Sequence, residues 1–114
     1  MEGIFSNRMH KEMRRTLLKL IILTKASRSR LYPYSLIKKL ISEKMFYSDD
    51  TEIKNDVYNA VSTLEHFGLI KMSERTGKGR NKTYYSITKK GRDALKTAMR
   101  MRLKMRKYTE SLMG

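Results

Sequence analysis

The pattern of apolar and polar positions along the chain predicts four helices. In each of four segments the apolar residues recur every three or four positions, the spacing of a helix with one buried side. Pro33 suits the first turn of the second segment, and Thr88 can cap the fourth. The predicted helices cover approximately residues 8–24, 33–45, 51–67 and 88–112.

The stretches between these segments predict one β-hairpin and two less regular regions. Residues 70–76 and 82–87 alternate in the manner of strands, and Gly77-Lys78-Gly79 supplies a turn between them. Residues 1–7 are expected to form a loosely held arm, and residues 25–30 (KASRSR) a basic loop. The sequence therefore predicts a mainly α fold with a small hairpin.

The third helix, within Thr51–Ile70, is the segment on which the functional prediction depends. Asp49 and Glu52 match a capping box, and Gly68 falls where a helix end favours a left-handed residue. One side is expected to be buried and contains Ile53, Val57, Ala60, Val61, Leu64 and Phe67. The other side offers hydrogen-bonding groups that suit base edges and phosphates, namely Lys54, Asn55, Tyr58, Asn59 and Ser62.

The last helix contains a heptad-like stripe that indicates self-association. Its apolar members are spaced 4-3-4-3-4, as in a coiled-coil seam, and are Ala94, Ala98, Met101, Met105, Tyr108 and Leu112. A domain of this size has no segment left to cover so long a helix, so a second copy of the chain is the expected partner. We predict a DNA-binding domain over residues 1–87 and a dimerisation helix over residues 88–114.

Charge narrows the choice of partner. The chain has 114 residues with 26 Lys and Arg against 11 Asp and Glu, a formal charge of +15. Such a surface favours a polyanion, with nucleic acid ahead of an anionic membrane surface or a role in solubility alone. There is no cysteine and no apolar run long enough to span a membrane, so we expect a soluble cytoplasmic protein associated with the nucleoid.

Polar and basic residues crowd the tip of the predicted hairpin. A short hairpin tipped with several cations is typical of a wing that lies along a phosphate backbone or in a minor groove. The residues concerned are Arg75, Lys78, Arg80, Asn81 and Lys82.

Catalysis finds little support in the sequence. His10 and His66 are the only histidines, and no nucleophile–His–acid set, phosphate loop or metal-ligand spacing is visible. The acids Asp49, Asp50 and Glu52 suit a helix start better than a catalytic pair. We expect a protein that is not an enzyme, with no cofactor and no metal, while the sequence leaves open whether a small-molecule effector exists.

Three segments resemble the PadR-like family of winged-helix transcription regulators. They are LYPYSLI (Leu31–Ile37), NDVYNAVSTLEHFGLI (Asn55–Ile70) and YYSITKKGRDAL (Tyr84–Leu95), and the likeness extends over about Leu17 to Leu95. The resemblance implies a winged helix-turn-helix fold, a two-fold dimer through the C-terminal helix, and a position for Tyr58 at the DNA face.

The combined expectation is a sequence-specific regulator, most simply a repressor, that binds double-stranded DNA as a homodimer. Two alternatives remain open. An architectural nucleoid protein would bind DNA for its charge and shape alone, and an RNA-binding winged helix would prefer RNA. A specificity ratio of about 10³ or more over random DNA separates a regulator from an architectural protein.

Overall fold

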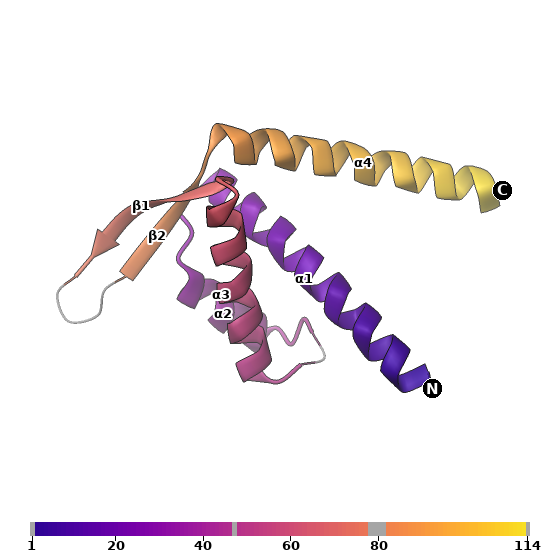
Figure 1. The fold of residues 1–114 in the computed structure, drawn as a ribbon, viewed down its shortest axis with the longest axis horizontal. Helices are drawn as coiled ribbons and strands as arrows, with labels where there is room; N and C mark the ends of the chain where they lie inside the picture. The colour runs from indigo at the N-terminus through magenta and orange to yellow at the C-terminus, as the bar shows by residue number, and fades with distance from the viewer. Residues whose placement is uncertain (1, 47, 78–81, 114) are drawn as a thin grey trace.

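Over residues 2–46, 48–77 and 82–113, which the structure describes, the computed structural model contains four helices and one antiparallel hairpin (Figure 1). The prediction of a mainly α fold with a small hairpin is confirmed. The elements in chain order are α1 (Glu2–Arg28), α2 (Pro33–Ser42), α3 (Asp50–His66), β1 (Ile70–Thr76), β2 (Lys82–Ile87) and α4 (Lys89–Met113).

One hydrophobic core joins the first three helices to the base of the hairpin. α3 packs against both α1 and α2, the hairpin projects to one side, and α4 leaves the hairpin and runs in the opposite direction (Figure 1). Beyond their common end α4 and α1 diverge, and the longest dimension of the molecule, 57 Å, follows the direction from the hairpin to the far end of α4. The core residues are Leu18, Ile22, Leu23, Ala26, Leu31, Leu36, Ile37, Leu40, Ile53, Val57, Ala60, Val61, Leu64, Ile70 and Ile87.

Local signals at both ends of α3 behave as the sequence predicts. The Asp49 side chain accepts a hydrogen bond from the backbone N–H of Glu52 at 2.8 Å and so satisfies one free donor of the first turn. At the other end Gly68 has φ of +73°, a left-handed conformation that carries little cost only for glycine. α3 therefore has defined limits and feeds directly into β1.

The hairpin is anchored to the core at its base. Ile70 pairs with Ile87, and both side chains are buried. Leu31, in the connection before α2, adds a short bridge, because its N–H donates to the Tyr85 carbonyl and the Tyr85 N–H donates back. Tyr85 is half-buried and Ile87 is buried, so these alternate residues of β2 face the core.

The start of α4 is tied to the end of α3. The Thr88 hydroxyl caps α4 by accepting from the Gly91 N–H at 3.0 Å, and it donates to the Gly68 carbonyl at 2.6 Å. A Cβ atom at Gly91 would lie 2.0 Å from the Leu69 carbonyl oxygen, so only glycine allows α4 this close approach. The ammonium of Lys90 also donates to the Phe67 carbonyl at 2.8 Å.

The first helix is longer than the sequence pattern predicted. The arm expected over residues 1–7 is wrong for residues 2–7, and the basic loop expected over residues 25–30 is wrong as far as Arg28, because α1 covers both. No proline interrupts this stretch. The Thr24 and Ser27 hydroxyls bond to the carbonyls of Leu20 and Thr24 within the helix, so these polar residues do not end it.

Two further expectations are corrected at helix ends. α2 ends at Ser42 rather than near Met45, because Lys44 adopts a left-handed φ of 49° that a continuing helix forbids. Phe67, expected in the buried stripe of α3, is 57% exposed. It follows the last residue of α3, and its ring lies edge-on against His66 outside the core.

Candidate nucleic-acid interface

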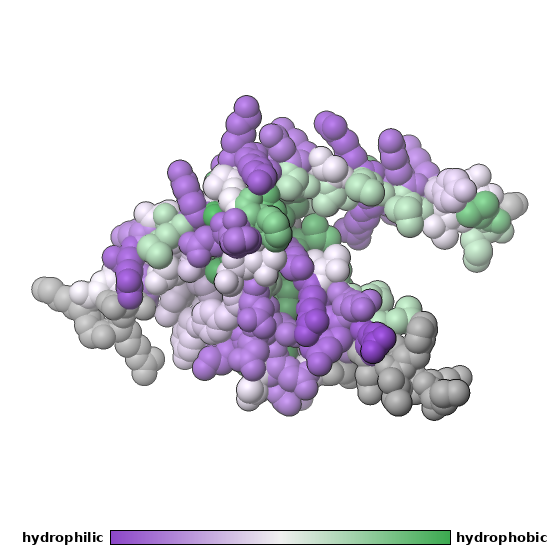
Figure 2. Space-filling view, viewed as in Figure 1, coloured by the Kyte–Doolittle hydropathy of each residue, from purple (hydrophilic) through white to green (hydrophobic). Residues whose placement is uncertain are grey.

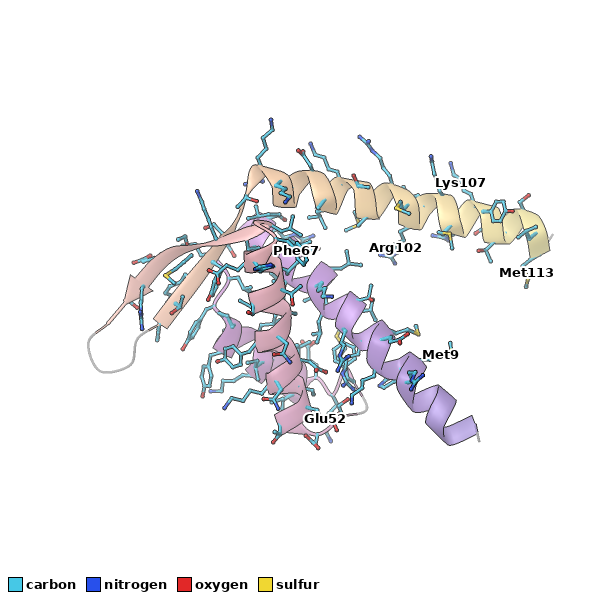
Figure 3. The ribbon with its side chains drawn as sticks, viewed as in Figure 1. Met9, Glu52, Phe67, Arg102, Lys107 and Met113 are labelled. Atoms are coloured by element: carbon cyan, nitrogen blue, oxygen red, sulfur yellow. The ribbon has the colours of Figure 1, made fainter. Side chains whose placement is uncertain are left out.

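The exposed side of α3 presents the hydrogen-bonding residues that the sequence singled out. Burial of Ile53, Val57 and Leu64 fixes the opposite side of the helix in the core. Lys54, Asn55, Tyr58, Asn59 and Ser62 are all exposed, so they lie together on one accessible face. The labelled Glu52 and Phe67 mark the two ends of this helix (Figure 3).

A buried ion pair fixes the first turns of α3 against α1. Arg14 is 3% exposed, and both its Nε and Nη2 lie 2.7 Å from one carboxylate oxygen of Asp56. Its guanidinium also donates to the Ser48 hydroxyl and approaches Glu52 at 3.5 Å. Because the guanidinium is planar and its donors are fixed, this contact restrains the rotation of α3.

Charged side chains usually lie at the surface, so Arg14 on the first helix and Asp56 on α3 would be expected to face solvent. Both side chains are buried and neutralise each other. The pair joins positions that are 42 residues apart, a link that helical periodicity cannot show.

The hairpin stands beside α3 in the position of a wing. Arg75 and Lys82 are exposed and lie near its tip, in neighbouring pairs of the ladder. The register shifts between Met72 and Glu74, which marks a bulge that increases the local twist of the hairpin. The predicted contact residues Lys78, Arg80 and Asn81 lie outside the described residues.

Sequence reasoning missed a cluster of tyrosines and cations between the start of α2 and the wing. The Tyr32 ring lies 5.9 Å from the Tyr34 ring and 5.4 Å from the Tyr84 ring. Cations cover the three rings at 4.8–5.6 Å and are Arg30 on Tyr84, Lys38 on Tyr34 and Lys82 on Tyr32.

This tyrosine–cation cluster combines the two kinds of donor that bind phosphate oxygens, phenolic hydroxyls and charged nitrogens. Glu74 pairs with Arg30, which leaves Lys38 and Lys82 as the cations available to an anion. The repeated tyrosines in LYPYS and KTYYS are the sequence signal that could have indicated the cluster. Their proximity, however, depends on how the wing packs beside α2.

Tyr85, on β2, is half-buried against the core. Burial raises the pKa of its phenol, and Glu65 and Tyr58 act in the same direction. The Tyr85 hydroxyl is protonated around pH 7, as an ordinary tyrosine is, and can donate a hydrogen bond.

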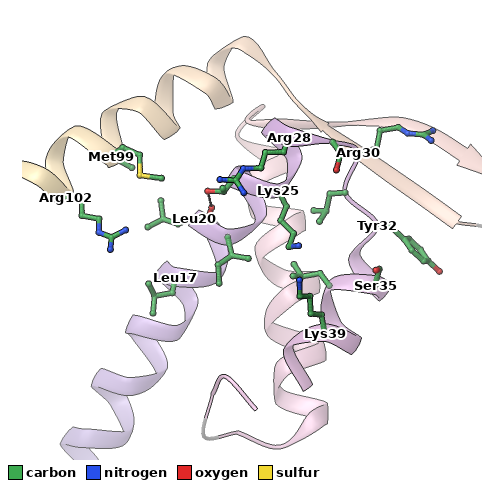
Figure 4. A pocket seen from close by; sticks show the side chains of 16 residues that line it. Leu17, Leu20, Lys25, Arg28, Arg30, Tyr32, Ser35, Lys39, Met99 and Arg102 are labelled. Atoms are coloured by element: carbon green, nitrogen blue, oxygen red, sulfur yellow. Dashed lines mark hydrogen bonds between the residues drawn. The ribbon is translucent and has the colours of Figure 1, made fainter. Parts of the chain in front are cut away.

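A hollow of about 590 Å³ lies between α1, α2 and α4 (Figure 4). Its apolar lining includes Leu17, Leu20 and Met99. The cationic side chains around it are Lys25, Arg28, Arg30, Lys39 and Arg102, with no acidic residue in the lining. The hollow extends from α4 to Arg30 and Tyr32, which also belong to the tyrosine–cation cluster beside the wing.

Within the residues that the structure describes there is no group of three or more potential metal ligands from His, Asp and Glu. The helices of the same part of the chain include none long and apolar enough to cross a membrane.

The winged-helix arrangement agrees with the comparisons to known proteins. The sequence model for the transcriptional regulator PadR-like family matches residues 22–97, which include α2, α3, the hairpin and the start of α4. This chain belongs to the PadR-like family. None of the curated proteins matches the sequence.

Solved structures of PadR-family proteins share the fold at low sequence identity. A regulator from Eggerthella lenta has 22% identity and a TM-score of 0.71, covering 97% of this chain and 94% of that one. A PadR-like transcription factor from Bacteroides fragilis has 18% identity and a TM-score of 0.73, with 92% and 98% covered. A PadR family regulator from Clostridium difficile has 19% identity and a TM-score of 0.68, covering 85% of this chain and 98% of that one.

Family membership identifies this PadR-like protein as a transcription regulator of a DNA-binding class. Its family and its structural neighbours are regulators, which are generally not enzymes. The match ends at Thr97 and so includes only the first member of the predicted dimer seam, Ala94.

The dimer seam predicted on α4 forms a largely exposed apolar face in the single chain. Ala94 and Ala98 are half-buried, whereas the exposed fractions of Met101, Met105, Tyr108 and Leu112 rise from 60% to 71% along the helix. α1 adds a second exposed apolar stripe, Met9, Met13 and Leu17. Met9 lies on the side of α1 that faces the opening toward α4 (Figure 3).

Proposed function

We propose that this PadR-family protein is a sequence-specific regulator that binds double-stranded DNA as a homodimer and represses transcription by occupying a promoter. The observation that carries the proposal is the exposed face of α3. It offers the uncharged groups of Asn55, Tyr58 and Asn59 on a helix held rigidly at both ends. A helix that needed only to adhere to DNA would carry Lys and Arg at these positions.

In this mechanism α3 enters a major groove. The amides of Asn55 and Asn59 can each make paired hydrogen bonds to an adenine edge, while Lys54 and Ser62 bind phosphates or bases. The cations of the wing bind the flanking backbone, and the tyrosine–cation cluster contacts phosphates beside the start of α2. Base contacts determine which DNA sequence is preferred, and backbone contacts supply most of the affinity.

Homodimerisation follows from the apolar stripes of α1 and α4. Exposed Met and Leu side chains line both helices, and contiguous apolar surface of this kind marks interaction sites. A second copy supplies a matching surface and would place two α3 helices on one duplex, so the preferred site would be a palindrome. The protein would act in the cytoplasm at the nucleoid.

Selection of bound sequences from a random pool of duplex DNA tests this proposal. We expect one palindromic sequence to emerge and to bind about 10³-fold or more tightly than random DNA at the same salt concentration. Equal affinity for selected and random duplexes would favour an architectural protein instead. Displacement of the selected duplex by an equal amount of duplex or single-stranded RNA would indicate an RNA-binding winged helix.

A further inference from the structure

One side of α4 carries a stripe of exposed cations that the proposed DNA interface does not use. We call it the α4 basic stripe, and each member is exposed. Two acidic residues lie on this side of the described helix, Asp93 and Glu110, and Glu110 pairs with Arg106. The stripe consists of Lys89, Arg92, Lys96, Arg100, Lys104 and Lys107.

The stripe lies on the side of α4 opposite its contact with the body of the molecule. Ala98 lines the hollow beside α1, and Lys89 and Lys107 are each nine residues away from it. Nine residues correspond to about two and a half helical turns, which places both lysines on the far side of the helix. Lys107 points away from α1 and α3 in Figure 3, and Figure 2 shows hydrophilic side chains projecting from this edge.

A duplex bound by α3 and the wing cannot reach this stripe. Thr88 ties the start of α4 to the C-terminal end of α3, whereas Lys54 and Asn55 lie in the first two turns of α3 and Asn59 near its middle. Glu52 marks that first end in Figure 3, at the edge of the molecule opposite α4. The stripe and the proposed DNA face therefore point in different directions.

The amount of charge on α4 also requires its own explanation. From Lys89 onward there are nine Lys and Arg against two acids, a net +7 of the +15 carried by the whole chain. Cations beside an apolar seam disfavour dimerisation through mutual repulsion, so the seam gives no reason for them. Charge that served solubility alone would be mixed in sign rather than almost purely basic.

We infer that the α4 basic stripe binds the phosphate backbone of a second DNA duplex, so that the protein bridges two duplexes. The inference rests on the proposed function, which supplies the first duplex. The stripe runs about 27 Å along a straight helix, a length over which a duplex presents roughly 16 phosphate charges. Because Lys and Arg would contact only the phosphate backbone, the second duplex could have any sequence.

The arrangement of α4 favours DNA over an anionic membrane. A basic amphipathic helix binds an anionic membrane by burying its apolar face in the interface. On α4 that face begins against α1, where Ala98 lines the hollow, and the proposed dimer would cover the rest of it, so only the cations remain available. A duplex needs only the cations.

A capture experiment tests the bridge. A duplex that carries the selected palindrome is immobilised and saturated with protein, excess protein is washed away, and a labelled duplex of random sequence is added. Wild-type protein should retain the labelled duplex. The triple variant Lys96→Gln, Arg100→Gln and Lys107→Gln should still bind the first duplex. It should retain the second duplex about 100-fold less at 0.1 M salt. The slope of log affinity for the second duplex against log salt concentration should be smaller by about 2.7.

A charge-matched control uses three exposed cations of α1, in the variant Arg8→Gln, Lys11→Gln and Arg15→Gln. It removes the same charge and should retain the second duplex as wild type does. Equal losses in the two triple variants would show that net charge, rather than the stripe, captures the duplex, and would overturn the inference.

The remaining outcomes separate the two proposals. If wild-type protein fails to bind the selected palindrome, the proposed function fails. If it binds that duplex and captures no second one, only the bridge is wrong.

Vesicles of phosphatidylglycerol and of phosphatidylcholine serve as the membrane probe. Stripe-dependent binding to the anionic vesicles alone, without capture of DNA, would assign the stripe to membranes and refute the bridge.

Discussion

The substitution Arg14→Met removes the guanidinium that neutralises Asp56 in the interior. Asp56 is 8% exposed, so its carboxylate would remain buried without a counter-charge, a change that typically costs about 3–5 kcal/mol. Glu52 contributes little to this value, because its side chain is 51% exposed and lies 3.5 Å from Arg14. For a chain of this length we expect the Tm to fall by roughly 10–20 °C.

Urea unfolding followed by circular dichroism measures this loss. The protein concentration must be the same for every variant, because self-association adds to apparent stability. The neighbouring exposed Arg15 provides the control, and Arg15→Met should change the free energy of unfolding by about 0.5 kcal/mol or less. The double variant Arg14→Met with Asp56→Met should recover most of the loss, since it removes both buried charges.

Two results would refute this reasoning. Similar small losses for Arg14→Met and Arg15→Met would mean that the ion pair contributes nothing to stability. A double variant as unstable as Arg14→Met would mean that the loss comes from packing of the arginine stem rather than from the unpaired charge of Asp56.

Three further predictions concern the proposed interfaces. Changing Arg75 and Lys82 together to alanine should weaken binding to all DNA sequences and reduce the log–log salt slope by about 1.8; an unchanged slope would show that neither cation contacts phosphate. Met105→Glu should convert the dimer into monomers by light scattering, and a wild type already monomeric at micromolar concentration would contradict the seam. Asn59→Ala should weaken binding to the selected site by about 1–3 kcal/mol while hardly changing affinity for random DNA, and equal losses on both would argue against base recognition.

The elements that the sequence predicted well are those with signals contained in a few neighbouring residues. Asp49 caps α3, Gly68 ends it, and Thr88 caps α4, each through contacts that the local sequence implies. The two strands also begin and end where predicted. Such signals act over one turn of chain, so they can be recognised without knowing the fold.

The features that the sequence did not predict depend on residues far apart in the chain. Arginine is a residue type usually found at the surface. Arg14 is buried only because the Asp56 carboxylate on α3 pairs with its guanidinium. Tyr32 and Tyr84 approach each other only when the wing packs beside α2. Phe67 fits the helical period of the buried stripe, but the helix has ended and no neighbouring element covers its ring among the described residues.

α3, the proposed recognition helix, is held by the same two helices that carry the exposed apolar stripes. Arg14 joins α1 to the first turns of α3, and Thr88, with the close approach of Gly91 to Leu69, joins α4 to its last turn. These contacts are rigid, since one is a buried ion pair and the other leaves no room for a Cβ atom. Any change in the angle between α1 and α4 must therefore tilt α3. In a dimer built on α1 and α4, the packing of two copies would set the distance between the two recognition helices and thereby the spacing of the two half-sites.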